Sequence, residues 1–487
     1  MIKNFVKKNR PSPSKYLQSG GYVLIQVLVF GIIAVYLLGA LTSWAVIDVK
    51  SSRQAGSREL SIQIAEAGID YYRWHLAHAP TDYQDGTGVT GPYVHDFYDK
   101  NDNKIGTFTL DITPPLLGSS LVIVKSTGRT DAEPNIARTI QAKFAKPSMA
   151  KYAVATNDVM RFGEGTEIFG PIHSNKGIRF DGLTHNIITS SMAAYDDPDH
   201  GGNNEFGVHT HVKPPPQTGL YADFVTTEAP LSPVPSRLDI FTAGRQFPVP
   251  EIDFTSLTAD IAQMKTDAVA NGYWKTGSGK YGYHIVLKTN DTFDLYKVTK
   301  LNTDCNDAWS IKTESIYASN VAFPTNGIIF LEDDIWVDGQ INTARLTIIA
   351  AVLPDNSNTR KNITINKDLL NTNYNGTDVI GLIAQNNINV GLISEDNLQI
   401  DAALVAQKGR VGRFYYSSSC SSTYYKRQIL TLNGMLATAL RYGFAYTDGT
   451  GYQIRILNYD SDLLYSPPPS FPLTSDQYIT ISWEEIK

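Results

Sequence analysis

Residues 19–47 read SGGYVLIQVLVFGIIAVYLLGALTSWAVI, a long apolar run that begins after Ser-Gly-Gly. Its last 26 residues, 22–47, contain no Asp, Glu, Lys, Arg or His. As an α-helix with a rise of ~1.5 Å per residue they would reach about 39 Å, enough to cross a hydrocarbon core of about 30 Å with some tilt. The run therefore predicts a membrane-spanning helix. It is longer than the apolar region of about 7–15 residues in a cleaved secretory signal.

The segment before this helix is basic. It carries no acidic residue and five basic ones, which are Lys3, Lys7, Lys8, Arg10 and Lys15. By the positive-inside rule, residues 1–21 stay in the cytoplasm and the long C-terminal part is exported. We therefore expect a single-pass protein of the cell membrane with an extracellular C-terminal domain.

The junction between this leader and the helix has a more specific pattern. Ser19-Gly20-Gly21 is followed by Tyr22 and an unbroken apolar run, which resembles the prepilin signal of type IV pilins and pseudopilins. The resemblance implies that prepilin peptidase cuts between Gly21 and Tyr22. It also implies that the helix stays on the mature protein and packs against other pilin subunits, in the membrane and in a filament. The family usually has an acidic residue at the fifth mature position, and this chain has Gln26 there. Some minor and tip-located pilins also lack that acid, and they are the better match.

A second helical pattern continues beyond residue 47. Two apolar stripes with three-four spacing lie side by side; one is Ile62, Ala65, Ile69, Tyr72 and Leu76, and the other is Leu60, Ile64, Ala67, Tyr71 and Trp74. Together they predict a helix that packs on a sheet with one face and on other helices with the other. Within it, residues 65–70 (Ala-Glu-Ala-Gly-Ile-Asp) resemble a short segment common in large, PilX-like minor pilins, and Pro80 ends the helix.

Residues 93–146 have the pattern of an antiparallel meander. Apolar and polar residues alternate, which gives the predicted sheet one apolar face. Strands are expected at residues 93–99, 105–112, 121–126 and 137–145. Because the preceding helix can cover the apolar face, residues 48–146 predict an α+β pilin-like domain that follows the transmembrane helix.

One turn of this meander resembles a calcium loop. Asp99, Asn101 and Asn103 alternate like the first ligands of such a loop. However, the twelfth position is Leu110 rather than Glu, and Asp and Asn also tolerate the backbone angles of hairpin turns. We favour a hairpin turn over a calcium site.

After Pro147 the chain contains a degenerate repeat, in which an apolar strand leads through a polar turn into a second short strand. Copies begin at Ile172, Phe330, Leu382 and Leu404, and the equivalent residues Ala384 and Ala406 are 22 positions apart. Short strands spaced by about 20 residues predict a parallel β-solenoid, in which each coil buries its inward residues by stacking on the next. The alternative is an irregular β-sandwich.

We therefore expect residues 147–487 to form a mainly-β outer domain. Insertions are predicted at about residues 193–250, as a surface excursion, and 251–300, as a helix and a hairpin. A proline-rich segment at residues 465–472 is expected to lie over the solenoid. A last strand at residues 478–483 is expected to cover its open end.

The composition bears on the number of domains, on the class of partner and on the state of the two cysteines. The 487 residues predict two or three domains. The net charge is −6, and loss of the five basic residues of the leader would change it to −11, which argues against a nucleic-acid partner. The two cysteines, Cys305 and Cys420, either form a disulfide outside the membrane or remain separate thiols.

A histidine pair is the best metal candidate in the sequence. His209-Thr210-His211 places two imidazoles on the same side of a strand, where they could bind zinc with a third ligand. His200 and three carboxylates, Asp196, Asp197 and Asp199, come shortly before them. No general base or nucleophile is recognisable beside the pair, so we favour a polar excursion and expect neither a metal nor another cofactor.

The acidic run at residues 332–334 raises an enzyme hypothesis. Glu332 and Asp334 could share a strand face, as carboxylates do in solenoids that cleave polysaccharides, but a solvated turn also explains them. The sequence has no Ser-His-Asp signature, phosphate-binding Gly loop or CxxC pair, and we expect no enzyme.

The function we expect is that of a non-catalytic minor subunit of a type IV pilus-like filament. It would display its outer domain for adhesion to a surface glycan or protein ligand, or for pilus assembly. The alternatives are a membrane-anchored surface protein outside any filament and a β-helix carbohydrate-active enzyme.

Overall fold

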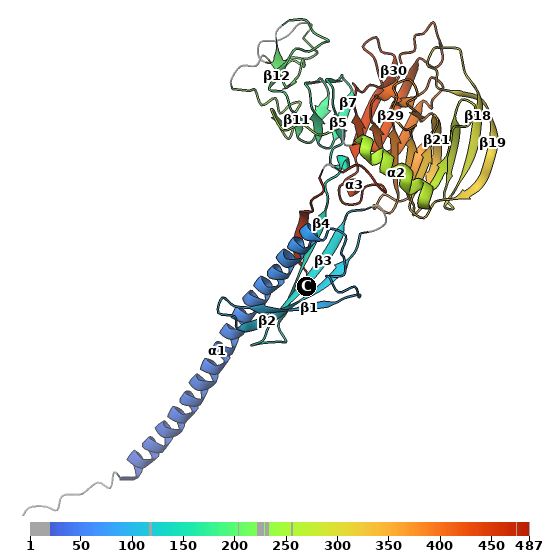
Figure 1. Cartoon of the computed structure of the whole chain (residues 1–487). Helices are drawn as coiled ribbons and strands as arrows, with labels where there is room; N and C mark the ends of the chain where they lie inside the picture. Colours follow the sequence, from blue (N-terminus) through green and yellow to red (C-terminus); the bar gives the residue numbers. More distant parts are fainter. Residues whose placement is uncertain are drawn as a thin grey trace, which may run out of the picture.

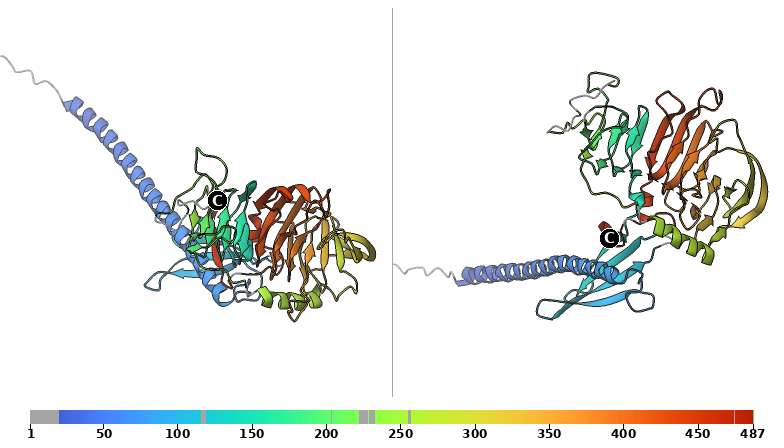
Figure 2. Two further views of the ribbon diagram at one scale, coloured as in Figure 1. Left: turned by 90° about the horizontal axis from the view of Figure 1, so that it is seen from above. Right: turned by 45° about the horizontal axis from the view of Figure 1, so that its top comes forward.

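The structure is a computed structural model that describes residues 20–115, 119–202, 204–221, 228, 233–254, 257–473 and 475–486. Residues 1–19 of the expected leader lie outside the described residues. A long helix leads into a small sheet, and a larger β-rich domain lies beyond that sheet (Figure 1). The two further views show the same arrangement from above and with the top tilted forward (Figure 2).

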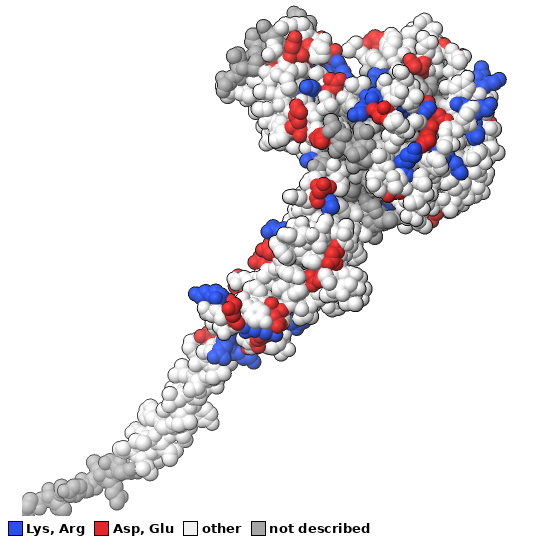
Figure 3. Space-filling model, viewed as in Figure 1, with Lys and Arg blue, Asp and Glu red and all other residues white. Residues whose placement is uncertain are grey.

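The helix α1 (Gly20–His78) has 59 residues and no break. At ~1.5 Å per residue it is about 89 Å long. All described side chains from residue 22 to residue 50 are exposed, and we call residues 22–47 the shaft. In Figure 3 the described lower part of the helix is white, so no charged side chain is seen on this face of it. The first blue and red side chains appear further up, near the sheet. Among the described residues, one helix is long and apolar enough to cross a membrane, and it is this one.

The C-terminal half of α1 buries one stripe. Its buried residues repeat every three or four positions and are Ser57, Ser61, Ile64, Ala65, Gly68, Ile69, Tyr72 and Leu76. The first predicted stripe is confirmed, because Ala65, Ile69, Tyr72 and Leu76 are buried against the sheet. The packing of the second stripe on other helices stays a prediction. Trp74 is 59% exposed, while Leu60 and Tyr71 are only partly buried. Ser57 and Ser61 extend the buried stripe towards the shaft, although a hydrophobic pattern does not show small polar residues of this kind.

Among the described residues, five strands form the antiparallel sheet that this stripe covers. In the order of the sheet they are β1 (Tyr93–Tyr98), β2 (Lys104–Thr113), β3 (Val122–Thr130), β4 (Ala137–Ala145) and β31 (Ile479–Ile486). The predicted meander of four strands is confirmed within a few residues at each end. We call α1 from residue 51 onward together with these strands the sheet domain.

Two glycines set the distance between helix and sheet. A Cβ built on Gly68 would lie 2.2 Å from Oγ of Ser126, and one built on Gly128 would lie 2.1 Å from the carbonyl oxygen of Ser61. Position 128 therefore requires glycine, because its Cβ would meet backbone atoms, whereas a Cβ at Gly68 would force the side chains of Ser126 and Phe108 to move. This close approach also explains why residues 65–70 of the helix are rich in small side chains.

The last strand of the chain belongs to the sheet domain. β31 pairs antiparallel with β4, and the C-terminus lies beside this sheet (Figure 1). The prediction that this strand covers the end of the outer domain was wrong, because the alternation of a strand does not reveal its partner. The outer domain is consequently inserted between two adjacent strands of one sheet, and it does not extend to residue 487.

The outer domain is built mainly of short strands. Along the chain they are β5 (Val154–Thr156), β6 (Met160–Phe162), β7 (Thr166–Phe169), β8 (Ile172–Ser174), β9 (Ile178–Phe180), β10 (Leu183–Thr184), β11 (Ile188–Ser190), β12 (Ala194–Tyr195), β13 (Glu205–Phe206), β14 (Val208–His209), β15 (Arg245–Gln246), β16 (Tyr273–Lys275), β17 (Tyr283–Lys288), β18 (Thr292–Leu301), β19 (Ile311–Ala322), β20 (Ile328–Leu331), β21 (Ile335–Ile341), β22 (Arg345–Ala350), β23 (Ile363–Thr364), β24 (Leu369–Asn371), β25 (Val379–Ala384), β26 (Ile388–Val390), β27 (Asn397–Ala406), β28 (Val411–Arg413), β29 (Lys426–Thr438) and β30 (Gly451–Tyr459). Three short helices accompany these strands in the described residues, namely η1 (Met149–Lys151), α2 (Leu257–Asn271) and α3 (Asp462–Tyr465).

Strands from successive segments of the outer domain pair in parallel. Ala384 of β25 pairs with Ala406 of β27, so the predicted 22-residue spacing is the register between neighbouring strands. One ladder of buried apolar residues crosses seven strands in the order Ile348, Leu382, Leu404, Leu436, Val154, Ile172 and Ile188. The first strands of the domain thus continue the stack where its last strands end. The solenoid designation of the whole outer domain stays a prediction.

The two expected insertions are partly built into this stack. β14 pairs in parallel with β9, and β15 pairs with β11, so the prediction of a surface excursion over residues 193–250 was wrong in part. Two-residue strands are too short to show a period of two, and the high Pro, Gly, Asp and Asn content conceals them. Likewise β17, besides forming the predicted hairpin with β18, pairs in parallel with β21.

The proline-rich segment packs on the outer domain. A guanidinium nitrogen of Arg345 in β22 donates to the carbonyl oxygens of Ser466 and Pro467. A Cβ on Gly381 of β25 would lie 2.8 Å from Pro468. These contacts agree with the prediction that the segment lies over the β-rich domain.

Candidate functional site

The expected processing site lies in the first turn of α1. Because α1 begins at Gly20, the bond between Gly21 and Tyr22 is within this turn, whose backbone N–H groups have no intrahelical acceptors. Tyr22 is 80% exposed. The bond is therefore at the free end of the helix, far from the sheet domain.

Gln26 is the one amide side chain in the shaft. A second polar residue, Thr42, satisfies its hydroxyl within the helix by donating to the carbonyl oxygen of Gly39 at 2.9 Å. Gln26 is exposed. In an apolar environment a hydrogen bond from an amide side chain to another helix stabilises the association of the two helices, typically by about 1–2 kcal/mol or less. Gln26 can therefore form such a hydrogen bond, but it lacks the charge of the acid that the family usually has at this position.

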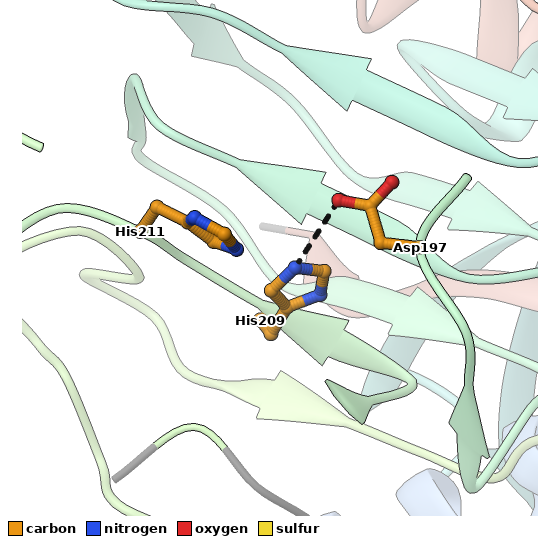
Figure 4. Close-up of side chains that lie close together, drawn as sticks. All are labelled: Asp197, His209 and His211. Carbon is orange, nitrogen blue, oxygen red and sulfur yellow. Dashed lines mark ion pairs between the residues drawn. The ribbon is translucent and has the colours of Figure 1, made fainter. Parts of the chain in front are cut away.

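The outer domain brings together the predicted histidine pair and one of the predicted carboxylates. One ligand atom each from Asp197, His209 and His211 lies within 4.8 Å of the others. Nε2 of His209 is 3.6 Å from Oδ2 of Asp197. All three residues are at most 1% exposed. In Figure 4 the carboxylate faces the His209 ring, and the His211 ring lies on the other side of His209. We call these three residues the His-Asp cluster.

Two backbone elements position the cluster. His209 is the last residue of β14, which pairs with β9, and His211 follows two residues later. Asp197 follows β12 and is held by two hydrogen bonds. Its N–H donates to Oε2 of Glu205 at 3.0 Å, and its Oδ1 accepts from the N–H of Asp199 at 3.0 Å. Oδ2 of Asp197 is thereby left to face the imidazoles.

Neighbouring side chains complete the environment. Tyr195 Oη lies 3.3 Å from Nδ1 of His209. Arg179 donates from Nε to Oδ2 of Asp181 at 2.7 Å, and the other oxygen of Asp181 accepts from the backbone N–H of His211 at 2.9 Å. Sequence reasoning missed these residues because they come from strands that carry no ligand pattern of their own.

The electrostatics favour a charged carboxylate beside neutral imidazole. Burial opposes ionisation of Asp197, but the neighbouring His209 and the hydrogen bond from the backbone N–H of Asp199 outweigh it and lower the pKa of Asp197 to about 2. Burial, together with the positive charge of Arg179, lowers the pKa of His211 to about 4. His211 is therefore neutral at pH 7, which is the form that can bind a metal.

The other predicted members of the cluster have different roles. His200 pairs with Glu205, and its ring centroid lies 5.1 Å from that of His211. Asp199 binds the guanidinium of Arg441. Asp196 is exposed. The sequence could not single out Asp197 among three neighbouring carboxylates, since only the fold decides which of them is buried.

The Asp99 loop is a hydrogen-bonded turn. The Asp99 carboxylate accepts from the backbone N–H of Asn101 at 2.8 Å and from that of Asn103 at 2.9 Å. The oxygen Oδ2 also accepts from the Asn103 amide. The loop joins β1 to β2, as we expected of a hairpin turn.

The acidic run at residues 332–334 lies in the bend between β20 and β21, and each carboxylate has a partner. Glu332 pairs with Lys265. Asp333 accepts from the backbone and hydroxyl of Ser278, and Asp334 accepts from Asn362. Asp333 is only 6% exposed, so this turn is less solvated than expected.

Cys305 and Cys420 form a disulfide across 115 positions, with their Cα atoms 5.5 Å apart. The bond joins the loop after β18 to the segment after β28. It lies beside a small buried cluster of Ala308, Leu392 and Tyr416.

Comparisons with known proteins add a distant likeness. No protein-family model matches the chain, and no curated protein matches it. Among solved structures the chain is similar to the crystal structure of the competence-associated pilin ComZ from Thermus thermophilus. The TM-score is 0.30, with 13% identity over 88% of this chain and 97% of that chain.

Proposed function

We propose that this chain is a non-catalytic minor subunit of a type IV pilus-like filament. Prepilin peptidase would cut it between Gly21 and Tyr22, and the shaft would pack against the helices of other pilin subunits. The outer domain, as a β-solenoid, would be displayed outside the cell for adhesion to a surface glycan or protein, or for assembly.

The observation that carries this proposal is the continuity of α1. The apolar shaft and the stripe packed on the sheet belong to one helix of 59 residues with no linker between them. A flexible linker would let the domain reorient relative to a membrane anchor. A continuous helix instead fixes the sheet domain to the shaft, so subunits whose shafts pack together would also have their domains in register.

The exposed shaft supports the same proposal. Its side chains contact nothing else in the described residues, although nearly all of them are apolar. Such a surface must be covered by lipid or by other helices. A filament subunit needs both partners, lipid before assembly and neighbouring shafts afterwards.

A second candidate function is that of a membrane-anchored surface protein outside any filament. Gln26 favours it, because an uncharged side chain cannot neutralise the amino terminus of a neighbouring subunit. Replacing Gln26 by Glu tests this difference. If the chain is a filament subunit, Gln26→Glu should increase or maintain its share of the filament fraction; if it is only an anchor, both forms should stay in the membrane.

Processing is the direct test of the proposal. The intact mass and N-terminal sequence of the protein extracted from membranes of its own cells should show a start at Tyr22. Gly21→Ala should leave the leader attached, while the matched variant Gly20→Ala should still be cut. A start at Met1 in the unchanged protein would contradict the proposal.

A further inference from the structure

We propose that the His-Asp cluster binds one zinc ion, which fastens residues 196–211 to the stack of strands. The inference does not depend on the proposed function, since it concerns the fold of the outer domain. Two imidazole nitrogens and one carboxylate oxygen are a donor set typical of Zn²⁺, whereas Ca²⁺ and Mg²⁺ prefer oxygen ligands alone.

The distances fit this ion. Zinc bonds of about 2.0–2.1 Å in a tetrahedron place neighbouring ligand atoms roughly 3.4 Å apart. Nε2 of His209 and Oδ2 of Asp197 are 3.6 Å apart, and the ligand atoms of all three residues lie within 4.8 Å. Small side-chain rotations would therefore close the site.

The hydrogen bonding leaves the ligand atoms unsatisfied. Both ring nitrogens of His211 are buried without a hydrogen-bond partner among the described residues, and so are Nε2 of His209 and Oδ2 of Asp197. Buried polar atoms are nearly always satisfied in folded proteins. One ligand atom from each of the three residues lies within 4.8 Å of the others, a spacing that an ion between them could occupy.

The groups behind the ligands are placed as in a metal site. Tyr195 Oη, 3.3 Å from Nδ1 of His209, can accept the proton of that nitrogen and so leave the lone pair of Nε2 toward the ion. The backbone N–H of Asp199 holds the other oxygen of Asp197 at 3.0 Å. Both contacts fix the orientation of a first ligand before an ion arrives.

The buried charges also call for a cation. Three carboxylates, Asp181, Asp197 and Glu205, have side chains at most 1% exposed, and the guanidinium among them belongs to Arg179. The three carboxylates outnumber this one guanidinium, and a divalent cation beside Asp197 would offset the difference. Arg179 keeps its Nε on Asp181, and its Nη1 is 3.8 Å from Oδ2 of Asp197, beyond hydrogen-bond distance.

The rim of the cluster does not supply this charge. Asp199 lies there with Arg441, and Arg161 is 3.5 Å from the same carboxylate. All three side chains are between 22% and 35% exposed, so water screens them.

The site also explains how a weakly paired segment is held. β12 and β13 pair with each other through two residues each, and β14 pairs with β9 through two. Strands of this length contribute little stability by themselves. A zinc ion would link the segment after β12 to the segment after β14 and close the loop between them.

Metal analysis of the full chain in detergent tests the proposal. The protein would be purified without a metal column, treated with a chelator and dialysed against Zn²⁺. We expect one zinc per chain, with affinity reduced at least about tenfold in both Asp197→Asn and His211→Ala. The matched control His185→Ala, a histidine that pairs with Glu167 in the same domain, should keep full binding.

Two further measurements keep the test decisive if a variant fails to fold. Zn²⁺ should slow hydrogen exchange of residues 196–211 in the unchanged protein, and Co²⁺ should give the visible absorption of a tetrahedral site. The proposal is overturned if the unchanged chain binds no zinc under these conditions. It is equally overturned if folded Asp197→Asn and His211→Ala retain the ion.

Discussion

Gln141 of β4 and Glu484 of β31 face each other across neighbouring strands, and the Gln141 amide donates to Oε1 of Glu484 at 3.0 Å. The two residues are 343 positions apart in the chain. Between them the chain leaves the sheet domain, builds the outer domain and returns. The outer domain is therefore held at both ends by one sheet, and that sheet packs on the helix that carries the shaft.

This pairing predicts that cysteines at positions 141 and 484 will form a disulfide. Directly opposed residues of antiparallel strands have Cα atoms about 4.5–5.5 Å apart, within the range that a disulfide spans. The variant Gln141→Cys with Glu484→Cys should give a cross-linked peptide pair by mass spectrometry after mild oxidation.

The matched control for this cross-link is Lys125→Cys with Glu484→Cys. Lys125 of β3 is paired with Gln141, so β4 separates it from Glu484 by a second strand spacing of about 4.8 Å. This pair should not cross-link. If both pairs react equally, or neither reacts, β31 does not lie beside β4.

Gly128→Ala should destabilise the sheet domain. The added Cβ would lie 2.1 Å from the carbonyl oxygen of Ser61 and 2.5 Å from the backbone nitrogen of Ala65, so the helix must move away from the sheet. Overpacking of this kind costs typically about 1–3 kcal/mol in the free energy of unfolding. Chemical denaturation, followed by a spectroscopic signal from the sheet domain, measures this decrease in the free energy of unfolding.

Gly56→Ala is the contrasting change in the same helix. A Cβ there meets no atom within 4 Å, and alanine is favoured over glycine inside a helix by about 0.5–1 kcal/mol. This variant should be neutral or more stable. Equal destabilisation by both substitutions would show that the helix and sheet do not approach each other as described.

The free energy of unfolding should depend on pH through His284. This side chain lies between Glu314, at 2.7 Å from Nδ1, and Asp338, at 2.9 Å from Nε2. Burial opposes its positive charge, but the hydrogen bonds with the two carboxylates outweigh burial and raise the pKa of His284 to about 9. A raised pKa stabilises the folded state fully below the unfolded value of about 6.5, and this stabilisation is lost as the pH rises through about 9.

The corresponding variant is His284→Gln. Near pH 6 it should be less stable than the unchanged protein by about 3 kcal/mol, the free energy of a pKa shift of that size. The difference should shrink towards pH ~10. Urea midpoints of both proteins at several pH values test this, and a difference that does not change with pH would refute the role of the histidine.

Loss of the disulfide should lower the stability of the outer domain. A bond that closes a loop of 115 residues restricts the unfolded chain by about 4–5 kcal/mol on chain-entropy grounds. The double variant Cys305→Ser with Cys420→Ser should therefore unfold at a lower temperature than the oxidised protein. Reduced unchanged protein should behave like the variant, and a midpoint insensitive to both changes would contradict the expectation.

The sequence predicted those parts of the fold whose signals are local. The charge-free run gave α1, and alternating residues gave β1 to β4, because a half-buried strand or helix shows its own period. The 22-residue spacing of Ala384 and Ala406 gave the register of β25 and β27. Such features depend on residues near each other in the chain.

The remainder depended on contacts between distant residues. Nothing in residues 479–486 indicates that their partner is β4, since alternation is the same for any partner. Ser57 and Ser61 are buried against the sheet domain, which a hydrophobic pattern could not show. At the His-Asp cluster the spacing of His209 and His211 was readable, but the burial of Asp197 was not.

Isolating filaments sheared from its own cells tests whether this chain is a subunit of a pilus-like filament. If it is, the chain should be present in that fraction with Tyr22 as its first residue. It should be lost from the fraction in Gly21→Ala but not in Gly20→Ala. Intact filaments that lack the chain, with all of it in the membrane, would contradict the claim and leave a surface-anchored β-rich protein.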